Sequence, residues 1–296
     1  MFTAFYANGS AEEGRSETKY PTHVGGEILS SNVNRRRFLK YAGAGLVAGA
    51  AAIGGYHFYN QSSTPAPACE SPSCWTYVAL GDSWTGNICG GLSYVDYYAG
   101  HIESDLGVKV RVLNESINDL GMEELLSNLR TKQQLRNEIS EAKVVTFLIG
   151  GGEAEGIVLN PGITDIRKAL APWREIYDAV IDEIVSLRSP SDTIIRAIEY
   201  PNPWVSYLKK QGILDQVYPN CAAWVEQIAE AASEHNIPVA RVYQAWNGPN
   251  GDEDPVAKGY TRGDVSKLQS VVHPNEAGNR VIADVLRKLG YKPLSP

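Results

Sequence analysis

From residue 75 onward, short apolar runs alternate with segments in which apolar residues recur every three or four positions. The apolar runs predict strands at 76–80, 109–113, 144–149, 193–198 and 239–243. The third run, VVTFLI, is apolar throughout, which is typical of a strand that is buried on both faces.

Helices are predicted between these strands. One of them carries Trp173, Tyr177, Val180 and Ile184 at helical spacing. Strands that alternate with helices form a parallel sheet covered on both faces, and the length from 75 to 296 suits one such domain. We therefore expect an α/β domain with a five-stranded parallel sheet over 75–296.

The preceding residues have a different composition. Residues 1–34 are polar and mixed in charge, which predicts a disordered extension or a true start further downstream. In 35–59, Arg35 and Arg36 precede a stretch rich in Gly and Ala. This pattern resembles a twin-arginine export signal, and an N-terminal membrane anchor is the alternative.

Residues 60–74 form a Pro/Ser-rich linker, in which 66–68 (APA) fit a signal-peptidase site. We therefore expect an exported protein, extracellular or at the cell surface, either released or held by its N-terminal segment. Outside the cytoplasm, Cys69 and Cys74 could close a small loop and Cys89 could pair with Cys221. Because Cys221 falls on an apolar helical face, a buried free thiol is an equal alternative.

Composition and charge exclude several classes of function. The chain has 296 residues, 43% of them hydrophobic, and a formal net charge of −7, which argues against a nucleic-acid-binding protein. The five histidines do not cluster and no Cys-x-x-Cys pair is present, so we expect no zinc site. No Gly-rich phosphate loop opens a predicted helix.

A serine and a histidine fall at the sheet edge where ligands bind in open α/β folds, beyond the carboxyl ends of the strands. Ser83 follows the first strand in Gly-Asp-Ser, and His273 stands directly before the last helical segment. Each alone is readily explained as a helix cap. A serine hydroxyl becomes a good nucleophile when an adjacent imidazole takes its proton, so the pair indicates nucleophilic catalysis.

The two stretches that carry these residues, VALGDSWTGN and HPNEAGNRVIADVL, resemble the first and last blocks of the SGNH (GDSL-type) hydrolases. The resemblance covers essentially residues 75–296. It implies a flavodoxin-like three-layer α/β/α sandwich and an esterase that needs no metal or cofactor. Carried over, Ser83 is the nucleophile and supplies one backbone N–H of the oxyanion hole, while His273 is the general base and acid.

The inner blocks depart from the family pattern. Our alignment puts Asn118 at the family's second-block glycine, and Gly152 followed by Glu153 at its Asn-Asp pair. The first exchange is reciprocal, so we hypothesise that the Asn118 amide and the Gly152 N–H both donate to the oxyanion. Ser270 replaces the aspartate expected three residues before the histidine. Ser270, Asp264 or Glu153 is therefore the candidate group that orients the imidazole.

Three aromatic residues are candidates for the substrate pocket. Trp84 directly follows the nucleophile, and Tyr200 and Trp204 flank the prolines of EYPNPW after the fourth strand. We expect a carboxylic-ester hydrolase for acetyl or short acyl groups, on carbohydrates or on other alcohols. The alternative is a catalytically impaired relative that binds glycans or acyl groups. The expected partners are an ester substrate and the twin-arginine export machinery, with membrane contact only through the N-terminal segment.

Overall fold

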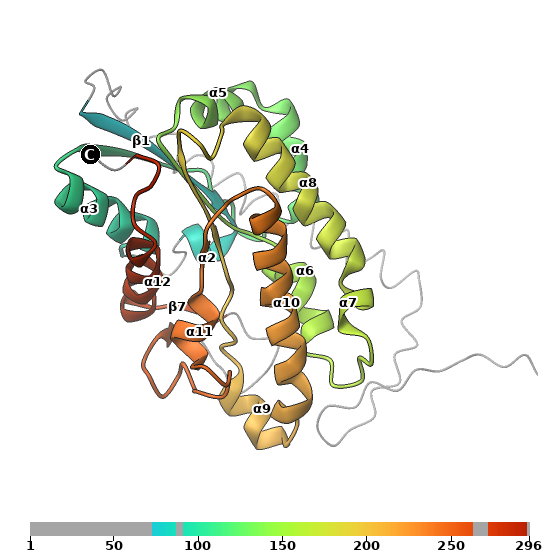
Figure 1. Cartoon of the computed structure of the whole chain (residues 1–296). Coiled ribbons are helices and arrows are strands. Elements are labelled where there is room, and N and C mark those ends of the chain that lie inside the picture. Colours follow the sequence, from blue (N-terminus) through green and yellow to red (C-terminus); the bar gives the residue numbers. More distant parts are fainter. Residues whose placement is uncertain (1–72, 87–90, 263–271, 295–296) are drawn as a thin grey trace, which may run out of the picture. The chain divides into compact units, whose positions relative to one another are not determined.

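Five parallel strands form the central sheet of the computed structural model, which describes residues 73–86, 91–262 and 272–294 (Figure 1). Their order across the sheet is β2-β1-β3-β4-β5. The strands are β1 (Cys74–Gly81), β2 (Lys109–Asn114), β3 (Val144–Leu148), β4 (Ile194–Ile198) and β5 (Val239–Ala240). The sequence-based prediction of a five-stranded parallel sheet is confirmed.

Helices cover both faces of this sheet, which completes the three-layer sandwich. On one face α3 (Tyr94–Leu106) packs against α12 (Glu276–Lys288). The other face is covered by α4 (Met122–Thr131), α5 (Gln133–Glu141), α8 (Ala171–Leu187) and α10 (Leu214–Glu234). Shorter helices lie in the connections: α2 (Ser83–Gly86), α6 (Gly151–Val158), α7 (Ile166–Ala169), α9 (Val205–Gln211) and α11 (Val242–Asn247).

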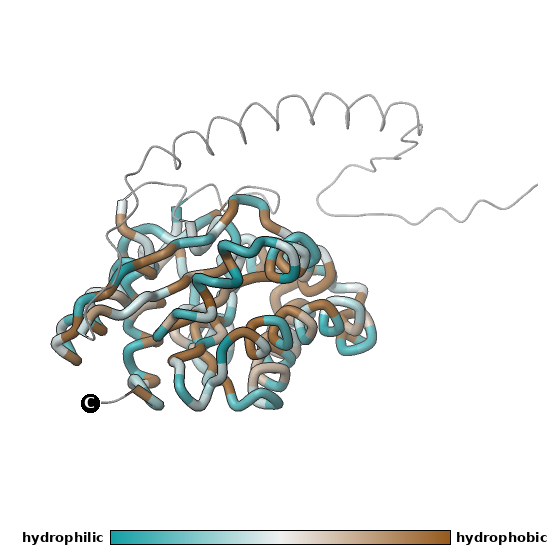
Figure 2. Tube along the Cα trace, turned by 90° about the horizontal axis from the view of Figure 1, so that it is seen from above, coloured by the Kyte–Doolittle hydropathy of each residue, from teal (hydrophilic) through white to brown (hydrophobic). Residues whose placement is uncertain are grey.

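The hydrophobic pattern explains this layering. Every residue of β3 and β4 is buried, as the continuous apolar run at 144–149 predicts for an inner strand. Along α8 the buried side chains are Trp173, Tyr177, Val180, Ile181 and Ile184, which is the predicted stripe. Figure 2 shows the helices alternating between teal and brown along the chain, as expected when one face of each is buried.

The fifth strand is shorter than the predicted 239–243, because Val242 already begins α11. The buried carboxylate of Glu199, at the end of β4, accepts hydrogen bonds from Arg241 Nη1 at 2.8 Å and from the Tyr243 backbone N–H at 3.3 Å. An acceptor at the first turn of a helix satisfies a backbone donor that would otherwise be unpaired. The chain therefore turns into a helix after two strand residues.

A second, two-stranded sheet holds the segment that precedes α12. It pairs β6 (Thr261–Arg262) with β7 (His273–Pro274) in antiparallel fashion, and Arg262 lies opposite His273. Asn275 caps α12 by accepting a hydrogen bond from the Gly278 N–H. These contacts fix His273 at the start of the last helix.

Several sequence-based predictions fall outside the described residues: the extension 1–34, the segment 35–59, most of the linker 60–74, and the side chains of Cys69, Cys89, Asp264 and Ser270. Cys74 is already part of β1 and is disulfide-bonded. Cys221 is a free, buried thiol, so its suggested pairing with Cys89 is wrong. No helix within the described part of the chain is long and apolar enough to cross a membrane.

Candidate active site

Ser83 lies at the carboxyl end of β1, where the strand turns sharply into α2. The turn depends on Gly81, which has φ +156°. A Cβ atom there would overlap the Leu148 carbonyl oxygen and the Thr85 side chain. The strand therefore ends at a close approach to β3, and Ser83 becomes the first residue of the short helix.

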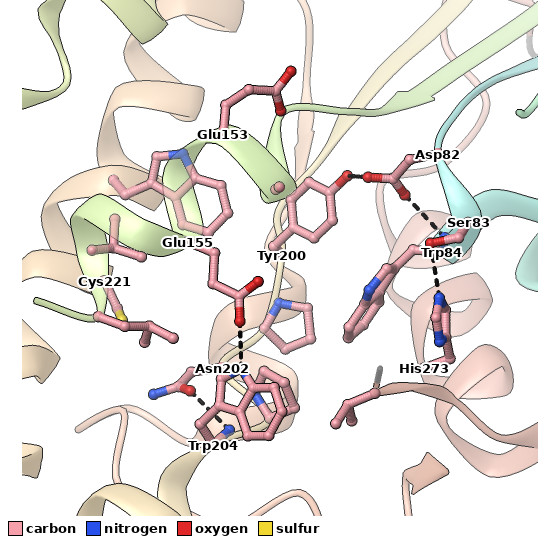
Figure 3. A pocket seen from close by; sticks show the side chains of 18 of the residues that line it. Asp82, Ser83, Trp84, Glu153, Glu155, Tyr200, Asn202, Trp204, Cys221 and His273 are labelled. Carbon is pink, nitrogen blue, oxygen red and sulfur yellow. Dashed lines mark hydrogen bonds between the residues drawn. The ribbon is translucent and has the colours of Figure 1, made fainter. Parts of the chain in front are cut away.

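His273 is within hydrogen-bond distance of Ser83. Its Nε2 atom lies 2.8 Å from Ser83 Oγ, although 190 positions separate the two residues in the sequence (Figure 3). His273 is buried, and the Trp84 ring lies beside it with 6.3 Å between ring centroids. The fold thus brings together the two residues that the sequence singled out.

A charged residue that the sequence analysis did not single out, Asp119, influences the protonation of His273. Burial lowers the pKa of His273, because it disfavours the charged imidazolium, and the negative charge of Asp119 opposes this effect by raising the pKa. Within the described residues, no hydrogen-bond acceptor is found for Nδ1 of His273. Two of the groups predicted to orient it, Ser270 and Asp264, lie outside those residues.

The loop after β2 reaches the cavity one position further along the chain than our alignment placed it. Asn118 lies beside Gly86 and is not part of the cavity wall, whereas Asp119, Leu120 and Gly121 line the cavity. Asp119 has φ +58°, a conformation that favours glycine and that aspartate tolerates better than most residues. The left-handed backbone at Asp119 thus lies where the loop reaches the cavity.

The loop after β3 leads into α6, where the two residues predicted from the sequence, Gly152 and Glu153, have different surroundings. Gly152 lies in the first turn of α6, and a Cβ atom on it would meet no atom within 4 Å. Glu153 accepts a hydrogen bond at 2.6 Å from the backbone N–H of Met122, the first residue of α4. The carboxylate therefore stabilises the start of a helix, and the structure records no contact between Glu153 and His273.

Asp82 connects the nucleophile turn to the loop after β4. Its Oδ1 atom accepts a hydrogen bond from the Trp84 N–H at 2.9 Å, and its Oδ2 atom accepts one from the Tyr200 hydroxyl at 2.5 Å. Asp82 is buried, and desolvation raises the pKa of its carboxyl to about 6, although both hydrogen bonds act in the opposite direction. Tyr200 is thus placed to hold the turn that carries Ser83.

A cavity of about 510 Å³ opens next to Ser83 and His273. All three predicted pocket residues, Trp84, Tyr200 and Trp204, line it (Figure 3), and Tyr200 is packed between Trp84 and Trp224. Trp224 and Glu155 also line the cavity and were not predicted. Within the described part of the chain, no group of three His, Cys, Asp or Glu side chains is placed to hold a metal ion.

Comparisons with known proteins bear on the family and the fold. Residues 79–281 match the model of the GDSL-like lipase/acylhydrolase family. No curated protein matches the chain in sequence. The fold is similar to that of the lipase Lip_vut3 from a goat rumen metagenome, at 21% identity and a TM-score of 0.59, over 73% of this chain and 98% of that one. It is also similar to a variant of Axe2, an acetyl-xylooligosaccharide esterase from Geobacillus, at 18% identity and a TM-score of 0.50, over 73% and 94% of the two chains.

Proposed function

Because the chain belongs to the GDSL-like lipase/acylhydrolase family, we propose that it is a serine esterase that cleaves acetyl or short acyl esters through Ser83 and His273. The observation that carries this proposal is the 2.8 Å contact between Ser83 Oγ and His273 Nε2 at the edge of the cavity. This is the separation that proton transfer from a hydroxyl to an imidazole requires.

The proposed reaction is acyl transfer in two steps. Ser83 Oγ attacks the ester carbonyl carbon while His273 Nε2 takes the hydroxyl proton. The C–O bond to the alcohol then breaks, and the alcohol leaves with the proton held by His273. Water attacks the acyl-serine, again giving its proton to His273, and the carboxylic acid is released as Ser83 recovers its hydrogen.

The negative oxygen of the tetrahedral intermediate needs donors. The N–H of Ser83 is at the start of α2, and the N–H of Gly152 is in the first turn of α6, where backbone donors have no partner within the helix. We assign these two N–H groups to the oxyanion hole. Asn118 is removed from the assignment, because it does not line the cavity.

The acyl group is proposed to be short because the cavity has only about 510 Å³ to share between the acyl group and the alcohol. The Asp119 charge assists the reaction by stabilising the imidazolium that forms when Ser83 is deprotonated. Axe2, by its name, acts on acetylated xylooligosaccharides, and an acetylated carbohydrate is one substrate that this proposal includes.

The first test is hydrolysis of p-nitrophenyl acetate by the full chain. We expect turnover that Ser83→Ala and His273→Ala each reduce by at least about 10³-fold. Ser140→Ala, a change at an exposed helix position, is the control and keeps the parent rate. If the parent and Ser83→Ala traces are the same, the esterase proposal is wrong. That result favours the alternative of a non-catalytic relative, and glycan binding becomes the next measurement.

We also propose that the protein is exported through the twin-arginine machinery. The support is the Arg35-Arg36 pair ahead of an uncharged Gly/Ala-rich stretch. The double variant Arg35→Lys/Arg36→Lys keeps the charge and removes the arginine pair. We expect this variant to remain in the cytoplasm, while Lys19→Arg leaves the location unchanged. Equal export of the double variant and the parent would refute this route.

A further inference from the structure

The cavity beside Ser83 has an excess of negative charge. Of the residues that the structure describes, four carboxyl side chains line it, and neither a lysine nor an arginine does. Among the described residues, none of the four forms an ion pair. They are Asp82, Asp119, Glu153 and Glu155.

Three of these carboxylates already have a described role, near Ser83 and His273 or at the start of α4. Asp82 accepts hydrogen bonds from Tyr200 and from the Trp84 N–H, Glu153 accepts one from the Met122 N–H, and Asp119 acts on His273. Glu155 differs, because its only described partner is the indole N–H of Trp204, which donates to Oε1 at 3.1 Å. Figure 3 shows Glu155 pointing into the cavity between Tyr200 and Trp204.

Aromatic side chains form part of the same cavity wall as Glu155. Trp204 contacts it directly, and Tyr200 and Trp224, also in the wall, are stacked with 5.5 Å between centroids and 19° between planes. Solvent reaches Glu155 inside the cavity, yet partial desolvation raises the pKa of its carboxyl, and the hydrogen bond from Trp204 acts in the opposite direction. Such a carboxylate is stabilised by any positive charge that enters the cavity.

We propose that the part of the cavity around Glu155 binds a cationic group of the substrate, an ammonium or a trimethylammonium, while the ester lies at Ser83. This inference rests on the proposed esterase function and adds that the substrate carries a positive charge. An anionic ester is repelled by the same four carboxylates. A neutral ester of the same shape fits but gains nothing from the charge.

The test compares two acetate esters that differ in charge and hardly in shape, acetylcholine and 3,3-dimethylbutyl acetate. For the parent we expect kcat/KM to be at least about tenfold higher for acetylcholine. Glu155→Gln keeps an oxygen that can accept from Trp204 and removes the charge, so the preference for acetylcholine falls to near unity. The control is Glu175→Gln, an exposed glutamate of α8 outside the cavity, which keeps the preference.

A second measurement separates this inference from the esterase proposal. Tetramethylammonium is titrated into Ser83→Ala while tryptophan fluorescence is recorded, and we expect saturable binding that Glu155→Gln abolishes. Equal kcat/KM for the two esters, or a preference that survives in Glu155→Gln, overturns the cation site. If neither ester is cleaved through Ser83 but tetramethylammonium binds through Glu155, the esterase proposal fails and the cation site stands.

Discussion

The Tyr200 hydroxyl donates a 2.5 Å hydrogen bond to Asp82 Oδ2, and this bond ties the loop after β4 to the turn that carries Ser83. The other oxygen of the same carboxylate accepts from the Trp84 N–H, the residue directly after the nucleophile. One buried carboxylate therefore sets the position of the Ser83 backbone N–H relative to the cavity. Tyr200 acts on the proposed reaction through Asp82 and is a positioning residue.

Tyr200→Phe removes this bond and keeps the ring between its aromatic neighbours. We expect kcat to fall about tenfold with little change in KM, because a hydrogen bond to a charged group is worth about 1.5–3 kcal/mol. The Tyr200 bond lowers the pKa of Asp82, so its loss raises that pKa above its present value of about 6. The variant should therefore lose activity, relative to the parent, as the pH falls from 8 toward 6.

The matched control for this variant is Tyr98→Phe. Tyr98 is equally buried, and its hydroxyl has no hydrogen-bond partner among the described residues. We expect the parent pH–rate profile from Tyr98→Phe. If Tyr200→Phe also keeps the parent kcat and pH profile, Tyr200 only fills space.

Asp119→Asn tests the charge beside His273. The Asp119 carboxylate raises the pKa of His273, so its removal lowers that pKa and moves the acid limb of the kcat/KM profile to lower pH. The imidazolium that forms during the reaction also loses stabilisation. We expect kcat to fall about tenfold, less than the roughly 10⁴ lost when a hydrogen-bonded aspartate is replaced in a serine protease.

The control for the charge change is Asp252→Asn, an exposed position outside the cavity. Asp252→Asn should change neither the position of the acid limb of the kcat/KM profile nor kcat. An acid limb that does not move in Asp119→Asn would show that Asp119 does not influence the protonation of His273.

Gly151 and Gly152 should respond differently to alanine. A Cβ atom on Gly151 would lie 2.7 Å from the Tyr200 ring, which its packing against Trp84 and Trp224 keeps from moving. We expect Gly151→Ala to lower the free energy of unfolding by about 1–3 kcal/mol. Gly152→Ala meets no atom and should change it by less than about 0.5 kcal/mol. Chemical denaturation of both variants measures the difference, and equal effects would contradict the close contact at Gly151.

Glu153→Ala separates a structural role from a catalytic one. The carboxylate accepts from the first N–H of α4, so its loss should lower the free energy of unfolding by about 1 kcal/mol. We expect kcat on p-nitrophenyl acetate to stay within about threefold of the parent value. A loss of activity near 10⁴ with unchanged stability would restore Glu153 as the group that orients His273.

The sequence predicted the sheet well because inner strands are apolar over most of their length and helices repeat their apolar positions. It also predicted that Ser83 and His273 lie at the same sheet edge, where the structure brings them into contact, since both stand at ends of regular elements. The sequence did not predict which loop residues face the cavity. Asn118 and Asp119 are neighbours in an irregular segment, and only the backbone conformation at Asp119 decides which of them faces the cavity.

The direction in which each side chain points was the other feature that could not be predicted from the sequence. Glu153 and Glu155 lie two positions apart on α6, and nothing in their sequence context indicates that one contacts the start of α4 while the other faces the cavity. Tyr200 was expected only as a pocket wall, because its bond to Asp82 joins residues 118 positions apart.

The position of His273 has a consequence for how the protein is made. Ser83 follows the first strand of the sheet, whereas His273 precedes its last helix, which packs on α3. While the ribosome is still making the chain, the serine is present without its partner imidazole. A nascent or prematurely ended polypeptide that lacks β7 therefore has no His273 to take the Ser83 proton, and the proposed esterase activity requires synthesis to continue past β7.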